Sequence, residues 1–209
     1  MKTNFLTCGI LALLCGAAPG FAGSVDSICD AVAGNLVSNC GFETGDFTDW
    51  TILNNDGNTA VEPNSFNPPG ANSGEFFAAL GDASSTPTTI SQTFSDVAGS
   101  TLTFSFYLYT DGNPYSFTAD WDGESLLSLG SAVTTTPEGY TEYSFTLTGT
   151  GSDTISFIEQ DPLGFDGLDD VVVVDPPPSG VPEPTSLAFA AAALVAITFA
   201  HRRRTRKTA

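Results

Sequence analysis

Hydrophobic and polar residues alternate over short stretches between residues 23 and 175. In the clearest stretch, 101–110, four apolar side chains share one face of an extended strand, namely Leu102, Phe104, Phe106 and Leu108. The pattern predicts strands at 35–39, 50–53, 76–80, 88–94, 101–110, 115–121, 126–129, 141–148, 154–158 and 168–174. The proline- and asparagine-rich stretch 62–74 is expected to be a loop. Because helical periodicity is scarce, we expect an all-β domain at 23–175, folded as an antiparallel β-sandwich (jelly roll).

An apolar segment without alternation lies at the start of the chain. Residues 1–22 have a lysine at the second position, an apolar run over 5–18 and small residues before Ala22. This arrangement is typical of a secretory signal peptide. A short transmembrane helix is the alternative, but Pro19 and Gly20 end the run early. We therefore expect residues 1–22 to direct export.

A second apolar segment, 187–200, lies near the other end and is followed by basic residues at 202–207. As a helix, these fourteen residues reach roughly 21 Å, less than the hydrocarbon core of about 30 Å. His201 and Arg202 can extend the span by snorkelling. We predict a single C-terminal transmembrane helix of marginal length. Its basic end stays in the cytoplasm, so the acidic domain lies outside.

A proline-rich linker, 176–180, precedes the motif formed by Val181, Pro182, Glu183 and Pro184. Proline fixes φ and lacks an N–H donor, so this stretch joins neither a helix nor a sheet. The motif, the apolar helix and the arginine-rich end together resemble the PEP-CTERM sorting domain over residues 181–207. In that family a membrane-embedded exosortase recognises and processes the tail. The resemblance implies an exosortase partner, and a plain tail anchor is the alternative.

Basic residues lie only at the two ends of the chain. Residues 23–181 contain no Lys, Arg or His but hold 23 of the 24 acids. Without cations, this segment cannot neutralise phosphates, which excludes nucleic-acid binding and adhesion to anionic lipid through a basic patch. Without histidine, it cannot form Ser-His-Asp or Cys-His catalysts or imidazole zinc sites. Carboxylate chemistry, hard cations and uncharged ligands such as sugars remain.

Four cysteines divide between the signal peptide and the domain. Cys8 and Cys15 are expected to leave with the signal peptide, whereas Cys29 and Cys40 remain in an oxidising compartment. We predict a disulfide between Cys29 and Cys40, which closes a twelve-residue loop and stabilises the fold by roughly 3 kcal/mol. The alternative is two free thiols, with no basic residue near them to activate either one.

Residues 35–51 read Asn-Leu-Val-Ser-Asn-Cys-Gly-Phe-Glu-Thr-Gly-Asp-Phe-Thr-Asp-Trp-Thr. They resemble the opening of secreted carbohydrate-binding-module-like jelly rolls, the galactose-binding-like sandwiches. Those domains often begin Asn-Gly-Gly-Phe-Glu, continue Gly-Asp-Phe and reach Gly-Trp. The stretch 168–171, Leu-Asp-Asp-Val, resembles their last strand. Cys40 and Asp49 depart from the pattern where glycine is usual, and the disulfide explains the first departure.

In related modules a structural calcium ion ties the first strand region to the last strand. The resemblance implies Ca²⁺ bound by Glu43 with Asp169 or Asp170, which supply the oxygen ligands that calcium takes. A domain whose carboxylates have no counter-charge also gains from binding a cation. Asp161 and Asp166 are close to the other two aspartates in sequence and could form another cluster with them. Solvated turn residues are the remaining alternative.

Two tyrosines are candidates for a sugar-binding surface. Tyr107 and Tyr109 lie on the strand face opposite the apolar side chains of 101–110. An aromatic ring offers a platform for the CH face of a sugar, and polar neighbours can bind its hydroxyls. Ordinary tyrosines on a sheet surface are the alternative. Trp50 and Trp121 are expected in the core instead.

These features predict a non-catalytic exported protein with a carbohydrate-binding role and polysaccharide as its partner. The C-terminal helix anchors it in the inner membrane before processing, and the tail then sorts it to the cell envelope or exopolysaccharide matrix. The alternative is a structural acidic matrix protein without sugar specificity, bridged by calcium. A glycosidase needs only two carboxylates, but this domain has no basic side chain to hold a substrate.

Overall fold

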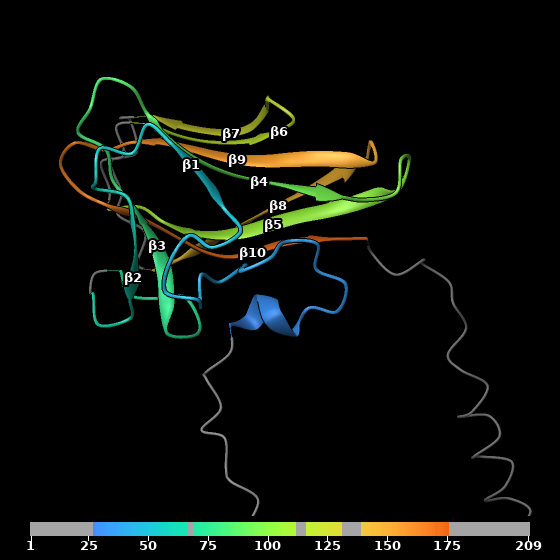
Figure 1. The fold of residues 1–209 in the computed structure, drawn as a ribbon, viewed down its shortest axis with the longest axis horizontal. Helices are drawn as coiled ribbons and strands as arrows, with labels where there is room; N and C mark the ends of the chain where they lie inside the picture. Colours follow the sequence, from blue (N-terminus) through green and yellow to red (C-terminus); the bar gives the residue numbers. More distant parts are fainter. Residues whose placement is uncertain (1–26, 67–68, 112–115, 131–138, 176–209) are drawn as a thin grey trace, which may run out of the picture.

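The computed structural model describes residues 27–66, 69–111, 116–130 and 139–175, which form two facing sheets (Figure 1). The elements are η1 (Ile28–Ala31), a 3₁₀ helix, and the strands β1 (Thr51–Leu53), β2 (Ala60–Pro63), β3 (Phe76–Leu80), β4 (Thr88–Ser95), β5 (Thr101–Tyr109), β6 (Ser116–Trp121), β7 (Glu124–Gly130), β8 (Thr141–Thr148), β9 (Ser152–Gln160) and β10 (Asp166–Val174). The first sheet has the order β1-β4-β9-β6-β7 and the second has the order β2-β3-β10-β5-β8. All pairs are antiparallel, so the predicted all-β sandwich is confirmed.

The central strands of the two sheets follow each other in sequence. In the first sheet β9 pairs with β4 and β6, and in the second sheet β10 pairs with β3 and β5. The connection 161–165 therefore crosses from the middle of one sheet to the middle of the other. Residues at its two ends meet at one end of the sandwich.

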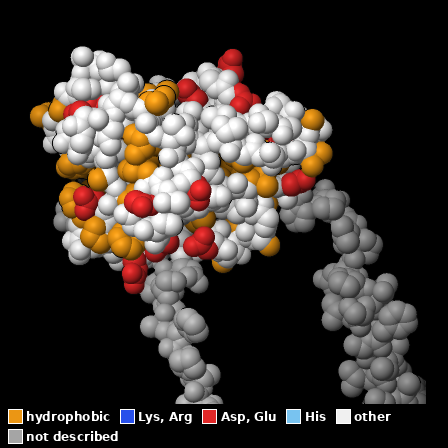
Figure 2. Space-filling model, viewed as in Figure 1, with side chains coloured by type: hydrophobic (Ala, Val, Ile, Leu, Met, Phe, Trp, Pro, Cys, Tyr) orange, Lys and Arg blue, Asp and Glu red, His pale blue; other side chains and the backbone are white. Residues whose placement is uncertain are grey.

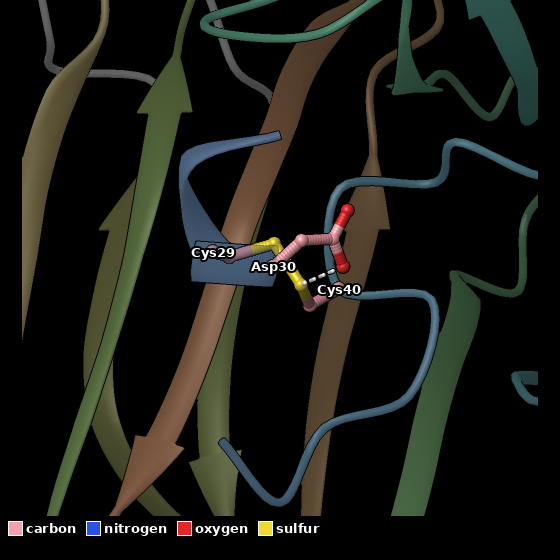
Figure 3. A group of neighbouring side chains, drawn as sticks. All are labelled: Cys29, Asp30 and Cys40. Carbon is pink, nitrogen blue, oxygen red and sulfur yellow. Dashed lines mark hydrogen bonds between the residues drawn. A yellow bond between two sulfur atoms is a disulfide. The ribbon is translucent and has the colours of Figure 1, made fainter. Parts of the chain in front are cut away.

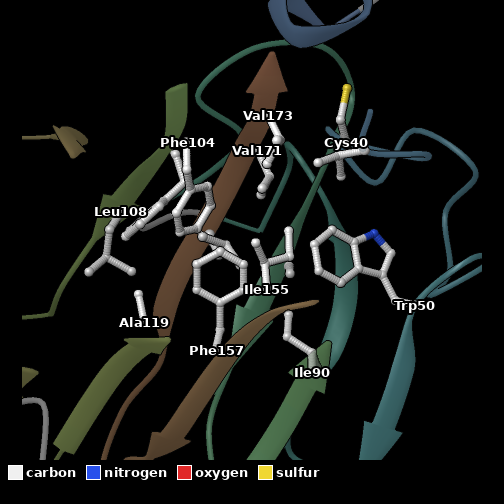
Figure 4. Close-up of a cluster of buried hydrophobic side chains, with 14 of the residues drawn as sticks. Cys40, Trp50, Ile90, Phe104, Leu108, Ala119, Ile155, Phe157, Val171 and Val173 are labelled. Carbon is white, nitrogen blue, oxygen red and sulfur yellow. The ribbon is translucent and has the colours of Figure 1, made fainter. Parts of the chain in front are cut away.

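The core lies between the sheets and is rich in aromatic rings (Figure 4). Side chains that alternate inward on β5 are almost completely buried, namely Leu102, Phe104, Phe106 and Leu108. On β9, the ring centroid of Phe157 is 5.0 Å from that of Phe106 and 6.1 Å from that of Phe104. Trp50 and Trp121 are also buried, as expected. The alternation in the sequence therefore identifies the buried face.

The structure corrects the strand expected at 35–39, which is extended chain followed by turns. The Leu36 N–H donates to the Val173 carbonyl at 2.8 Å. Its neighbour Asn35 bonds to β10 through its side chain instead: Oδ1 accepts from the Val173 N–H at 3.0 Å, and Nδ2 donates to the Val171 carbonyl at 3.3 Å. An asparagine side chain thus replaces the backbone ladder of a strand. Asn39 then turns the chain with a φ of 47°.

The structure also adds β2, part of which lies in the stretch expected to be a loop. Its four residues, Ala-Val-Glu-Pro, show no alternation and end in a proline. The strand is at the edge of its sheet and pairs only with β3. Proline is tolerated at an edge because its missing N–H interrupts no inner ladder.

The predicted signal peptide (1–22), linker (176–180) and sorting tail (181–207) lie outside the described residues. Within the described ranges, no helix is long and apolar enough to cross a membrane. The apolar segment 187–200, predicted as a transmembrane helix, is not part of those ranges. These three predictions therefore remain predictions.

Candidate ligand-binding and metal sites

A disulfide between Cys29 and Cys40 ties η1 to the turn before β1 (Figure 3). The two Cα atoms are 6.1 Å apart and both side chains are buried. The carboxylate of Asp30 lies 3.5 Å from Sγ of Cys40. These three side chains are close enough to form a metal cluster, but sulfurs in a disulfide are not thiolate ligands. The predicted pairing is confirmed, and it fixes η1 to the turn at Cys40.

A β-bulge in β10 directs two consecutive carboxylates into the protein. The register between β10 and β5 shifts between Asp169 and Val172, and Asp170 has a φ of 50°. Consecutive side chains of a regular strand point to opposite faces. The left-handed backbone at Asp170, which aspartate tolerates better than most residues, changes this direction. Asp169 and Asp170 are therefore both buried.

Neutral protein donors surround both carboxylates. Asp170 accepts hydrogen bonds from Oγ of Ser27, from Oγ of Ser73 at 2.8 Å and from Nδ2 of Asn72 at 2.7 Å. Asp169 accepts from the backbone N–H groups of Asn72 at 2.8 Å and Ser73 at 3.2 Å. Burial, with the nearby charge of Asp170, raises the pKa of Asp169 to about 8. These bonds join β10 to the N-terminal lead and to the loop before β3.

Glu43, the third residue of the predicted calcium set, makes different contacts. Its carboxylate accepts hydrogen bonds from the N–H groups of Glu75 at 3.0 Å and Phe76 at 3.2 Å. Burial raises its pKa. Among the described residues, two sets of three acidic or cysteine side chains come within 4.8 Å of one another, and neither contains Glu43, Asp169 or Asp170. The structure does not gather these three carboxylates, and calcium at this place remains a prediction.

A hollow of about 230 Å³ opens beside η1 on the outer face of the second sheet. Apolar side chains on its wall include Ile28, Val32 and Val172, and polar groups include Ser105, Tyr107 and Glu142. Burial and the neighbouring Glu142 carboxylate raise the pKa of the Tyr107 phenol. The structure thus places Tyr107, one of the two candidate sugar platforms, in a concave surface that is partly apolar and partly polar.

Tyr109, the other candidate, lies on the same face of β5 but outside this hollow. Its ring centroid is 6.1 Å from that of Tyr140. The Tyr140 hydroxyl donates a hydrogen bond to the Gly70 carbonyl at 2.8 Å, and burial raises the pKa of its phenol. Tyr109 therefore packs against a tyrosine that is attached to the loop before β3.

A second group of acids lies at the connection between β9 and β10. Oxygens of Asp111, Asp161 and Asp166 lie within 4.8 Å of one another. The carboxyl of Glu159, on β9, is beside that of Asp166. Glu159, Asp161 and Asp166 are no more than 3% exposed. We call these four residues the acidic cluster.

Proximity in sequence predicts this cluster only in part. It groups Asp161 and Asp166 with Asp169 and Asp170, whereas the structure separates the two pairs. Glu159 is absent from that predicted group. The signal that could have found it is its parity, because it shares the inward face of β9 with apolar residues.

Burial dominates the electrostatics of the acidic cluster. It raises the pKa of Glu159 to about 11 with the help of nearby Asp166, and it raises the pKa of Asp166 to about 8. Burial also raises the pKa of Asp161. Residues 23–181 contain no basic side chain to offset these charges. Figure 2 shows one face of the molecule, on which Asp and Glu side chains are visible and no Lys or Arg lies among the described residues.

Comparison with solved structures identifies the fold. The chain is similar to TmCBM61 in complex with β-1,4-galactotriose, with a TM-score of 0.54 and 22% identity over 68% of this chain and 99% of that chain. It is also similar to a Stig cyclase, Fisc from Fischerella sp. TAU, with a TM-score of 0.50 and 14% identity over 66% of this chain and 95% of that one. No family model and no curated protein match the sequence. At these identities the likeness shows the β-sandwich fold alone.

Proposed function

We propose that this protein is a non-catalytic, exported polysaccharide-binding protein that its C-terminal tail sorts to the cell envelope or the exopolysaccharide matrix. The observation that carries the binding role is the hollow beside η1 with Tyr107 in its wall. The likeness in fold to TmCBM61, whose structure holds β-1,4-galactotriose, supports a carbohydrate as the ligand.

The chemistry of the hollow suits an uncharged sugar. The ring of Tyr107 and the apolar side chains of Val32 and Val172 offer surface for the CH face of a pyranose. Glu142 and Ser105 supply acceptors for its hydroxyls. An anionic polymer would be repelled, because the surrounding domain carries only negative charge. A neutral polysaccharide is therefore the proposed partner.

The same side chains support a non-catalytic role. A glycosidase of the common kind uses a pair of carboxylates, one as acid and one as base or nucleophile. The hollow has Glu142 and Asp170 in its lining. Asp170 is already held by hydrogen bonds from Ser27, Ser73 and Asn72. A carboxylate fixed by protein donors is poorly placed to attack or protonate a substrate.

The Tyr107→Ala substitution tests the binding role. We expect it to weaken the binding of a polysaccharide found by glycan array by about fivefold or more, because loss of the ring removes roughly 1 kcal/mol or more of stacking and burial. Affinity electrophoresis in gels containing that polysaccharide measures the change. Tyr107→Phe keeps the ring and is expected to retain most of the binding.

The matched control is Tyr109→Ala, which removes a tyrosine from the same strand face outside the hollow. It is expected to leave binding unchanged. Equal losses in Tyr107→Ala and Tyr109→Ala would contradict the assignment of the hollow. If the unaltered protein retains no glycan, the acidic matrix protein without sugar specificity becomes the better description.

The sorting role predicts an effect of the motif alone. Replacing Pro182 and Glu183 together with alanine is expected to leave export intact and to trap most of the chain, uncleaved, in the inner-membrane fraction. The reason is that an exosortase-type enzyme would bind this motif just outside the bilayer before it cleaves the chain. Immunoblots of cell fractions measure the distribution, with Ser179→Ala in the linker as control. Identical fractionation of the double variant and the unaltered chain would contradict the sorting role.

A further inference from the structure

The acidic cluster contains buried oxygens that no N–H or hydroxyl group of the protein satisfies. Oδ2 of Asp161 is buried without a hydrogen-bond partner, and the buried carboxyls of Glu159 and Asp166 have each other as neighbours, with no N–H or hydroxyl donor at either oxygen of Glu159 or at Oδ2 of Asp166. Buried polar groups in folded proteins normally have a partner, because leaving a carboxylate in a dry interior without one is costly. These oxygens point to a ligand that the protein chain itself does not supply.

Two other fully buried aspartates of the same domain, Asp82 and Asp153, do have protein partners. Asp82 accepts hydrogen bonds from the Ser84 N–H at 2.6 Å and from Oγ1 of Thr88 at 3.1 Å. Asp153 accepts from the Thr150 N–H at 3.2 Å. The chain therefore surrounds buried acids with hydroxyl and N–H donors at these places. Around Glu159 it places three more carboxylates instead.

Backbone N–H groups bind one carboxyl oxygen of Asp161 and one of Asp166, and the second oxygen of each is left without a hydrogen-bond partner. Oδ1 of Asp161 accepts from the N–H groups of Leu163 and Gly164, each at 3.0 Å, so the side chain is fixed and Oδ2 is left over. Oδ1 of Asp166 accepts from the Asp111 N–H at 3.3 Å, which again leaves Oδ2. A Cβ added at Gly164 would be 3.1 Å from Oδ2 of Asp161 and would clash with Oδ2 of Asp111. Glycine lets the connection close against the cluster.

We propose that the acidic cluster is a binding site for a hard divalent cation, calcium, with ligands from Asp111, Asp161 and Asp166 and with the Glu159 carboxyl beside Asp166 adding to the negative charge. Calcium takes six to eight oxygens from carboxylates, carbonyls and water in flexible geometry. Like charges this close disfavour one another's ionised form, and a divalent cation reverses that effect. Residues 23–181 contain no basic side chain, so within the described residues no Lys, Arg or His offsets the charge of the cluster.

This site is different from the calcium set expected from the sequence, and it goes beyond the proposed polysaccharide binding. It joins the end of β9 in one sheet to the start of β10 in the other through their shared connection. A cation here would therefore link the two sheets directly. Its occupancy is independent of whether the hollow beside η1 binds a sugar.

The test is a calcium titration of the full-length chain after EDTA treatment, followed by calorimetry and thermal melting, with magnesium chloride in parallel. We expect calcium at 100 times its Kd to raise the Tm by roughly 5–10 °C. Glu159→Gln and Asp161→Asn are each expected to weaken calcium binding by about tenfold or more. Because glutamine has the same shape and is neutral at every pH, Glu159→Gln should melt in EDTA no lower than the unaltered chain.

The control for the other predicted set is Glu43→Gln, which is expected to keep the full response to calcium. The proposal is overturned if Glu43→Gln abolishes the response while Glu159→Gln and Asp161→Asn retain it. It is also overturned if calcium raises the Tm no more than magnesium does. A Glu159→Gln variant that melts normally in EDTA but no longer responds to calcium supports the proposal. If Glu159 had a purely structural role, the substitution would lower the Tm both in EDTA and with calcium.

Discussion

Without a divalent cation, the protein is expected to be more stable at pH 5 than at pH 8. Burial raises the pKa of Asp166 and Asp169 to about 8 and that of Glu159 to about 11. The folded protein therefore holds protons on these carboxyls that the unfolded chain releases above its ordinary pKa of about 4. Stability from these groups is fully present below that pH and is lost as the pH rises, through about 8 for Asp166 and Asp169 and through about 11 for Glu159.

The effect on melting is expected to be large. One pKa unit corresponds to about 1.4 kcal/mol, so the three groups together change stability by several kcal/mol. Each kcal/mol shifts the Tm of a chain of this size by about 2–4 °C. Burial raises the pKa of Asp82, but hydrogen bonds from Ser84 and Thr88 outweigh this effect and lower it. Asp82 therefore takes up its proton below pH 5 and does not contribute to the change between pH 5 and pH 8.

Thermal melts in EDTA at pH 5, 6, 7 and 8 measure this dependence. Glu159→Gln is the informative control, because an amide cannot take up the proton and the decline toward pH 8 should become shallower. A Tm that rises from pH 5 to pH 8 in EDTA would show that these carboxyls are ionised in the folded protein. That result would contradict the electrostatic description of the cluster.

Phe157→Ala is expected to lower the free energy of unfolding by about 3–5 kcal/mol. The side chain is 1% exposed and lies between the sheets. Its ring centroid is 5.0 Å from that of Phe106, 6.1 Å from that of Phe117 and 6.2 Å from that of Trp50. Truncation therefore removes buried area and leaves a cavity that rigid neighbouring rings cannot fill.

Urea denaturation gives this change from the midpoint and slope of the transition. Leu53→Ala is a matched control, because Leu53 is also an apolar strand residue but is 55% exposed. Its effect should stay within about 0.5 kcal/mol. If Phe157→Ala loses only about 1 kcal/mol, the rings around position 157 repack more freely than their contacts indicate.

Alternation in the sequence predicts the fold well where one strand face is buried and the other is not. β5 is the best case, because its apolar residues occupy every second position and all of them are inward. Alternation does not predict β2, because an edge strand of four residues is too short to show a pattern. Alternation predicts a strand at 35–39 that the structure does not contain. The composition of this stretch is strand-like, but it does not reveal that the side-chain amide of Asn35 makes hydrogen bonds to β10 in place of backbone groups.

The candidate sites were predictable to different degrees for similar reasons. The disulfide follows from the number of cysteines and the expected compartment. The position of Tyr107 on the outward face of β5 follows from alternation. The acidic cluster depends on how the connection after β9 folds back toward β5, and no local pattern specifies this. Glu159 is nevertheless a visible irregularity, an acid at the inward parity of Ile155 and Phe157. An acid at such a position indicates a site rather than a surface.

The position of β10 determines how the domain responds to mechanical force. It is the last strand, and it lies in the middle of its sheet with β3 on one side and β5 on the other. Ladder hydrogen bonds run perpendicular to the strands. A pull on the chain beyond residue 175 therefore acts along β10 and loads many bonds to β5 together in shear, instead of opening them one after another. A tether that joins the domain at this strand is attached where the fold resists extraction.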